Sequence, residues 1–201
     1  DETGTIPKTS QPTPGQFIEF YERIAKVGDS ILSLHVTGKL SGTLDSARIA
    51  ARELAGKFQI HPIDSASGSA AMGYMLREAR LMDRAGASVE AIKHRLGQIS
   101  RDVQVVLTLN SLEYARRSGR VKALQAALAS LLNVKPVIIL KEGVLEFGDR
   151  VRTRSKSLEY ILELTAQRVG RNLVNAAVVH SEDPESGLAL LDQVRQRLNC
   201  K

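Results

Sequence analysis

The side chains best suited to binding an anion lie in a short turn between an apolar run and a helical pattern. Residues 37–43 read Thr-Gly-Lys-Leu-Ser-Gly-Thr and follow an apolar run that ends at Val36. Free backbone N–H groups and the positive end of the helix dipole favour negative charge at a helix start. Ser41 and Thr43 add hydroxyl donors, and Gly42 allows close backbone approach. The turn predicts a carboxylate or phosphate site; the alternative is an ordinary capped helix start.

A second polar turn, Asp64-Ser65-Ala66-Ser67-Gly68-Ser69, follows the next apolar run. Asp64 and Ser65 could be imagined as a base and a nucleophile, but adjacent residues at a strand end seldom face each other. A turn-capping aspartate is the favoured interpretation. Hydroxyls and amides without a base predict a binding site, not a reactive one.

Helical and strand patterns alternate in the first hundred residues, and each strand is followed by a small-residue turn. The order is β-α-β-α-α after an initial helix, which predicts a parallel sheet flanked by helices with ligands outside the carboxyl ends of its strands. The predicted strands are 31–36 and 58–63, and the predicted helices are 15–26, 43–54, 70–84 and 88–99.

The second half contains predicted hairpins, which indicate a mixed or antiparallel sheet. Predicted strands are 102–109, 137–140, 144–147, 150–153 and 173–180, and predicted helices are 112–117, 121–132, 155–170 and 184–198. The predicted fold class is therefore α/β with two lobes. Residues 1–100 form the lobe with the anion-binding turn, and residues 101–201 form a second, basic lobe, expected to be incomplete at its C-terminus.

Composition and charge limit the function classes. The 201 residues are 43% hydrophobic and 4% aromatic, without tryptophan, which counts against a base-stacking surface for single-stranded nucleic acid. The single cysteine, Cys200, predicts a reducing, cytoplasmic location. The net charge of +6 is concentrated at 116–122 and 150–156, where a basic face could attract nucleic acid, anionic lipid, a nucleotide phosphate or an acidic partner, or simply be solvated.

Known catalytic motifs are missing from the sequence. The four histidines have no zinc-ligand spacing, and His35 and His61 lie in apolar strands as expected core or edge residues. There is no G-x-S-x-G elbow and no phosphate-binding loop of the G-x-x-x-x-G-K-[ST] type. The sequence predicts a binding protein without its own catalytic machinery, cofactor or metal.

An ordered set of short motifs resembles the DegV family over nearly the whole chain. The motifs are Thr9-Ser10-Gln11-Pro12, Leu40-Ser41-Gly42-Thr43, Asp64-Ser65, Gly119-Arg120-Val121, Val134-Lys135-Pro136 and Val151-Arg152-Thr153. The resemblance implies a bacterial two-lobed protein that encloses one long-chain fatty acid between its lobes. It also implies a partner, an ATP-dependent fatty acid kinase subunit that converts the presented carboxylate to acyl phosphate.

The resemblance carries over to individual residues. It implies that Thr9, Ser41 and the backbone N–H of Gly42 hold the carboxylate, with Ser10, Thr43 and Thr37 nearby. It implies that Arg120 and Arg152 face the phosphate or the kinase. The acyl chain is expected among aliphatic side chains, with methionines 72, 75 and 82 as an adaptable wall or as plain core.

Two family elements are absent from the sequence. The N-terminal strand with its Asp-Ser-x-x-Asp-like turn and the C-terminal His-x-Gly-Pro-Gly-like segment are not found, so we expect a fragment of a longer chain. Two alternative functions stay open: a small-molecule kinase subunit related to dihydroxyacetone kinases, and a nucleic-acid-binding regulator. We expect no nucleic-acid partner and at most transient membrane contact.

Overall fold

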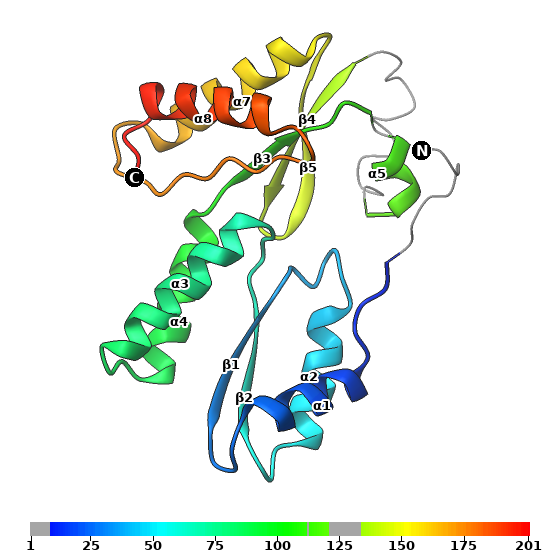
Figure 1. The fold of residues 1–201 in the computed structure, drawn as a ribbon, viewed down its shortest axis with the longest axis vertical. Coiled ribbons are helices and arrows are strands. Elements are labelled where there is room, and N and C mark those ends of the chain that lie inside the picture. The colour runs from blue at the N-terminus through cyan, green and yellow to red at the C-terminus, as the bar shows by residue number, and fades with distance from the viewer. Residues whose placement is uncertain (1–8, 112, 121–133) are drawn as a thin grey trace. The chain divides into compact units, whose positions relative to one another are not determined.

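The computed structural model describes residues 9–111, 113–120 and 134–201 and divides into two compact units (Figure 1). The first unit comprises Asp1–Val105 together with Leu140–Val144, and the second comprises Val106–Ile139 and Leu145–Lys201. The helix predicted at 121–132 lies outside the described residues.

A two-stranded parallel sheet forms the centre of the first unit. Strand β1 (Ser30–His35) pairs with β2 (Gln59–Asp64) in a register that runs from Ser30 opposite Gln59 to His35 opposite Asp64. This pairing confirms the predicted parallel sheet. It also places the turns that follow both strands at the same edge of the sheet.

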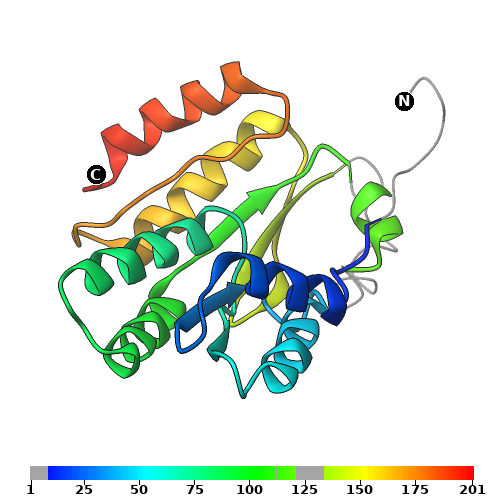
Figure 2. The same cartoon turned by 60° about the horizontal axis from the view of Figure 1, so that its bottom comes forward.

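Helices cover both faces of this sheet, because both faces present apolar side chains. Ile31 and Ile60 pack with two helices around the buried Tyr21, and Leu32, Leu34 and Ile63 pack against the other two (Figures 1 and 2). The first pair is α1 (Pro14–Ile24) and α2 (Thr43–Glu53), and the second pair is α3 (Ala70–Arg84) and α4 (Val89–Asp102).

Local sequence determines where these helices begin. Thr13 and Gln16 form a reciprocal capping box at the start of α1, and Ser88 accepts a hydrogen bond from the Ala91 N–H at the start of α4. Helix α3 has the bounds that its sequence pattern predicts, and Gly86 follows its end with a positive φ of 78°. Helix α2 differs, since its N-cap is Gly42 and no side chain caps it.

The second unit combines a three-stranded antiparallel sheet with helices, which confirms the predicted fold class. The strand order is β3-β4-β5, and α7 and α8 lie side by side (Figures 1 and 2). Ile138 is the centre of the sheet core, and Leu162, Val194 and Leu198 form the core between the two helices. The elements are β3 (Val105–Thr108), α5 (Glu113–Ser118), β4 (Lys135–Lys141), β5 (Val144–Val151), α7 (Arg154–Val169) and α8 (Pro184–Arg197).

Two predicted features of the second half are wrong, and one predicted strand begins later than expected. The turn predicted at 148–149 is the middle of the continuous strand β5, where a Cβ on Gly148 would lie 3.3 Å from the Val137 carbonyl oxygen. Gly148 therefore marks close packing against β4, not a turn.

The strand predicted over 173–180 has a single bridge, between Val174 and Cys200, within the described residues. The strand predicted from residue 102 begins only at Val105, because α4 continues to Asp102.

Within the described residues, no helix combines the length and the low polarity required to cross a membrane.

Two neighbouring residues of α3 provide a test of the core between α3 and α4. Met75 is fully buried, whereas Leu76 is 50% exposed. We expect Met75→Ala to lower the free energy of unfolding by about 2–5 kcal/mol, because it removes buried methylenes and leaves a cavity. Leu76→Ala should change it by less than about 1 kcal/mol. Urea unfolding followed by circular dichroism measures both, and equal losses would contradict this assignment of the core.

Candidate functional site

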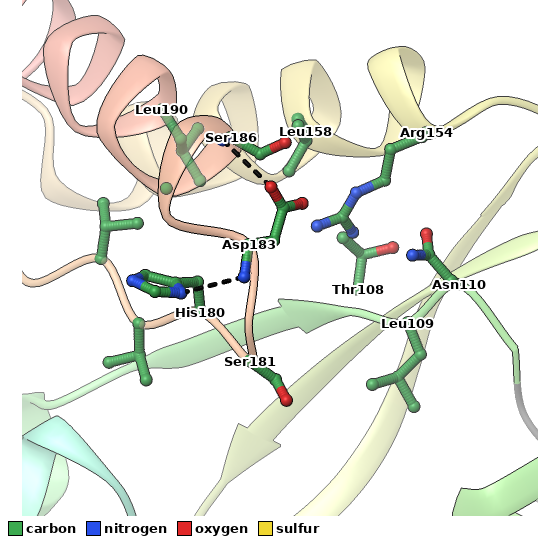
Figure 3. A pocket seen from close by; sticks show the side chains of 13 residues that line it. Thr108, Leu109, Asn110, Arg154, Leu158, His180, Ser181, Asp183, Ser186 and Leu190 are labelled. Atoms are coloured by element: carbon green, nitrogen blue, oxygen red, sulfur yellow. Dashed lines mark hydrogen bonds between the residues drawn. The ribbon is translucent and has the colours of Figure 1, made fainter. Parts of the chain in front are cut away.

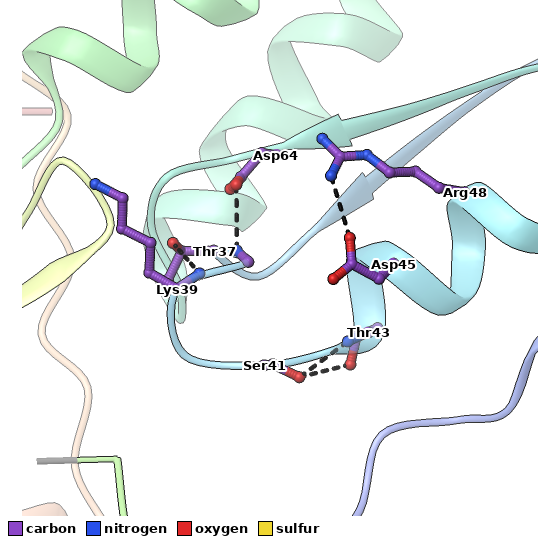
Figure 4. Close-up of polar contacts among 8 residues, drawn as sticks. Thr37, Lys39, Ser41, Thr43, Asp45, Arg48 and Asp64 are labelled. Atoms are coloured by element: carbon purple, nitrogen blue, oxygen red, sulfur yellow. Dashed lines mark hydrogen bonds and ion pairs between the residues drawn. The ribbon is translucent and has the colours of Figure 1, made fainter. Parts of the chain in front are cut away.

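The two polar turns predicted from the sequence are joined at the carboxyl edge of the first sheet. The Thr37 N–H donates to the Ser67 carbonyl at 2.9 Å, so hydrogen bonding between the two segments continues beyond the strands. The Gly38 N–H donates to Asp64 Oδ2 at 3.2 Å (Figure 4). The chemistry of both turns therefore lies on one connected surface.

Asp64 and Ser65 stabilise the turn that contains them. Asp64 Oδ1 accepts the Ala66 N–H at 2.7 Å. Ser65 is fully buried, its hydroxyl donates to the Ser67 carbonyl at 3.0 Å, and it accepts the Ser67 N–H at 3.1 Å. This geometry is the turn-capping arrangement that the sequence favours, and it leaves the Ser65 hydroxyl without access to a substrate.

The first turn forms a small cradle of hydrogen-bond donors at the start of α2, made of Ser41, Gly42 and Thr43 and called the cradle below. Within the described part of the chain, the backbone N–H groups of Gly42, Leu44 and Asp45 have no intramolecular acceptor. The helix dipole adds partial positive charge at the same point. Free N–H groups at a helix start are suited to an anion such as a carboxylate or a phosphate.

Two hydroxyls at the cradle interact with each other. Ser41 Oγ lies 2.8 Å from Thr43 Oγ1 and accepts the Thr43 N–H at 3.2 Å (Figure 4). The mutual bond uses one of the two hydroxyl protons and leaves the other for a ligand. Both residues are half-buried, so an anion can reach them from solvent.

The segment containing Thr9 and Ser10 runs past the cradle. A Cβ on Gly42 would lie 2.9 Å from Gln11 Nε2, so the glycine allows the Gln11 side chain to lie against this turn. Thr9 and Ser10 are exposed and precede Gln11 directly. The two segments are thus neighbours, and the carboxylate contacts of Thr9 and Ser10 stay a prediction.

Thr37 is placed differently from the other predicted ligands. Its side chain is 1% exposed, and its hydroxyl donates to the Gly143 carbonyl at 3.2 Å while accepting the Lys39 N–H at 3.3 Å. A hydroxyl carries one proton, and here that proton is directed at Gly143. Direct contact between Thr37 and a carboxylate stays a prediction that this arrangement does not favour.

A buried polar chain extends from the same strand toward α1. Tyr21 Oη lies 2.6 Å from Ser33 Oγ, which lies 2.8 Å from His35 Nε2. Burial lowers the pKa of His35, and the Asp64 charge opposes this in part. Burial also raises the pKa of Tyr21, against the effect of its bond to Ser33. Both groups are therefore neutral at pH 7, and His35 is the core residue that the sequence predicts.

The two arginines predicted to face a phosphate or a partner both belong to the second unit. Arg120 is exposed, and its guanidinium donates to the Ser118 carbonyl at 2.7 Å. Arg152 is exposed at the end of β5, beyond Val151. Their functional roles stay predictions.

The second unit also contains a pocket of about 200 Å³ that the sequence did not indicate (Figure 3). Arg154, Asp183 and Asn110 line it together with Thr108, whose buried hydroxyl has no partner within the described residues. Hydrogen bonds from Ser186 lower the pKa of Asp183, and Arg154 and His180 add to this effect. The residues that line this pocket come from segments far apart in the sequence, so no local motif indicates the pocket. Only the Asp-Pro start of α8 is recognisable as a helix start from the sequence.

Metal binding finds no support in the part of the chain that the structure describes. No group of three or more histidine, cysteine, aspartate or glutamate residues there is placed to hold an ion.

Comparison with known proteins identifies the family. A family model described as "Uncharacterised protein, DegV family" matches residues 1–201. The chain belongs to the DegV family. It is 36% identical to a DegV domain-containing protein of Streptomyces coelicolor over 94% of the chain and 67% of that protein, and 33% identical to one of Deinococcus radiodurans over 91% and 66%. The chain thus spans about two thirds of the length of these curated DegV relatives.

Solved DegV structures share the fold. A DegV family protein from Thermus thermophilus, described by its fatty acid binding, is 34% identical with a TM-score of 0.85, over all of this chain and 74% of the other. DegV of Bacillus subtilis, described as a fatty acid binding protein, is 28% identical with a TM-score of 0.85, over 97% and 71%.

The depressed pKa of His35 predicts how stability depends on pH. The unfolded chain takes up a proton near pH 6.5, whereas folded His35 resists protonation, so stability is fully present above about pH 6.5 and decreases as the pH falls below it. Thermal unfolding between pH 7.5 and 5.0 measures this. His35→Gln should flatten the slope, while the exposed His94→Gln should retain it; the same slope in both variants would show that His35 is not responsible.

Proposed function

We propose that this DegV protein binds one long-chain fatty acid and holds its carboxylate at the cradle. The observation that carries the proposal is the set of N–H groups of Gly42, Leu44 and Asp45, which have no acceptor among the described residues, next to the hydroxyls of Ser41 and Thr43. The relatives described as fatty acid binding support the identity of the anion. Thr9 is proposed as a further donor, because its segment passes this turn.

We also propose that the bound carboxylate is presented to an ATP-dependent kinase subunit. Neutral donors stabilise the charge of the carboxylate without tying its oxygens to a bidentate arginine, so a lone pair stays available for attack. A carboxylate oxygen would form a bond to the γ-phosphorus of ATP, and ADP would leave with the electrons of the broken P–O bond. The products are acyl phosphate and ADP.

In this proposal the chain binds and presents the fatty acid, and the kinase subunit catalyses the phosphate transfer. Ser65 is buried and His35 is hydrogen-bonded inside the core, so neither reaches the cradle as a nucleophile or base. The kinase subunit would supply the ATP site, and Arg120 and Arg152 are the proposed contacts to that subunit or to the transferred phosphate. The proposed location of the protein is the cytoplasm.

Ligand extraction tests the function directly. We expect the protein purified from lipid-containing cells to release one equivalent of long-chain fatty acid on solvent extraction, and native mass spectrometry should give a matching mass increase. Protein that is free of fatty acid and does not take up added palmitate or oleate would refute the proposal.

Substitution of the proposed donors tests the site. We expect Ser41→Ala to weaken fatty acid binding by about tenfold or more, because a hydrogen bond to a charged group contributes about 1.5–3 kcal/mol. Thr9→Ala combined with Ser41→Ala should weaken it further without lowering the melting temperature. Ser155→Ala, an exposed serine of the second unit, is the matched control. Unchanged affinity in the double variant would remove these residues from the site.

A further inference from the structure

The tip of the β4–β5 hairpin is packed against the loop that leads to the cradle. The tip, Leu140–Val144, belongs to the first compact unit, although the strands continue into the second. Thr37 Oγ1 donates to the Gly143 carbonyl at 3.2 Å, and Lys39 Nζ donates to the Glu142 carbonyl at 3.0 Å. Two adjacent carbonyls of the tip are thus bound by two side chains of one loop.

The backbone at Gly143 lies closer to the Thr37 side chain than a residue with a Cβ would allow. A Cβ at this position would overlap Thr37 Oγ1, and it would lie 3.6 Å from the Ala66 Cα. Thr37 belongs to the turn after β1 and Ala66 to the turn after β2. Gly143 therefore contacts both polar turns, and its missing side chain is a condition for the contact.

The backbone at this junction adopts conformations that few residues accept. Glu142 and Gly143 have φ values of 49° and 80°, which give the hairpin a left-handed turn that glutamate occupies at some cost. Ala66 also has a positive φ, of 47°. Strained residues of this kind persist where surrounding contacts determine the geometry, and here they meet at one point.

Thr37 connects the hairpin tip to the cradle through its backbone. The Thr37 carbonyl accepts the N–H groups of Leu40 at 3.1 Å and of Ser41 at 3.3 Å. A shift of Thr37 would therefore move Ser41, whose hydroxyl is half of the hydroxyl pair at the cradle. Gly143 therefore holds the Thr37 side chain, and the Thr37 backbone holds Ser41.

From these contacts we propose that Thr37 and Gly143 are positioning residues for the carboxylate site. Thr37 acts by holding the loop in the geometry that aims the Ser41 hydroxyl and the cradle N–H groups at the ligand, and the hairpin tip is the support that it is held against. This proposal rests on the proposed fatty acid binding and adds to it two residues that bind no ligand atom.

Four variants separate this role from general stability. Gly143→Ala introduces the overlap with Thr37. Gly86→Ala is its matched control, since Gly86 has a similar φ of 78° but no atom within 4 Å of the added Cβ. Thr37→Val keeps the shape and removes the hydroxyl, and Thr37→Ser keeps the hydroxyl.

Two measurements on the full chain give the decision. The first is the ratio of affinities for a fatty acid and for the alcohol of the same chain length. Gly143→Ala and Thr37→Val should weaken acid binding by about tenfold and alcohol binding by less than about twofold, with Thr37→Ser and Gly86→Ala close to wild type. The second is amide hydrogen exchange of Leu40 and Ser41, which should accelerate in Gly143→Ala and Thr37→Val only.

The outcomes are distinguishable. Equal losses for acid and alcohol, or unchanged exchange at Leu40 and Ser41 in Thr37→Val, would overturn the positioning role. Acid binding that fails in Thr37→Ser as well would instead indicate a steric requirement and also overturn it. A wild-type protein that binds neither ligand would refute the proposed function, and the exchange measurement would still decide whether the hairpin tip holds the loop.

Discussion

The parallel pairing of β1 with β2 determines where the polar chemistry of the first unit lies. Parallel strands end at the same edge, so the turns that follow His35 and Asp64 become neighbours, and the bond from the Thr37 N–H to the Ser67 carbonyl locks them together. An antiparallel pair would have sent one turn to the opposite edge. Apolar residues on both faces maintain the pairing, because they pack against the helices that cover each face.

At that edge, polar groups divide by burial into supporting and binding roles. Ser65 and Thr37 are almost fully buried, and the hydroxyl of each donates to a backbone carbonyl, which avoids a cost of about 1–3 kcal/mol for each unsatisfied group. Ser41 and Thr43 are half-buried beside N–H groups that have no acceptor within the described residues. The buried hydroxyls thus make the turns rigid, and the accessible donors are the ones suited to a ligand.

Local patterns in the sequence were enough to predict the parallel sheet, the bounds of α3 and the capping role of Asp64, since each depends on neighbouring residues. Contacts between distant residues were not predictable in this way. Thr37 and Gly143 are 106 positions apart, and nothing in either turn indicates the other. The turn predicted at Gly148 was wrong for the same reason. Glycine occurs both in turns and at positions of close packing, and only the contact with the neighbouring strand distinguishes the two.

The placement of Lys39 adds an argument about the cradle. Lys39 is the basic residue of the loop itself, and an ammonium beside a carboxylate would form an ion pair that competes for the oxygen lone pairs. Its Nζ instead donates to the Glu142 carbonyl at the hairpin tip, so the contact that helps to hold the loop also orients this charge toward the tip. Both features fit a site proposed to present a carboxylate as a nucleophile. The positive potential of the nearby ammonium favours binding of the anion. Because that ammonium is bound to a backbone carbonyl, it forms no ion pair with the attacking oxygen, which neutral donors alone contact.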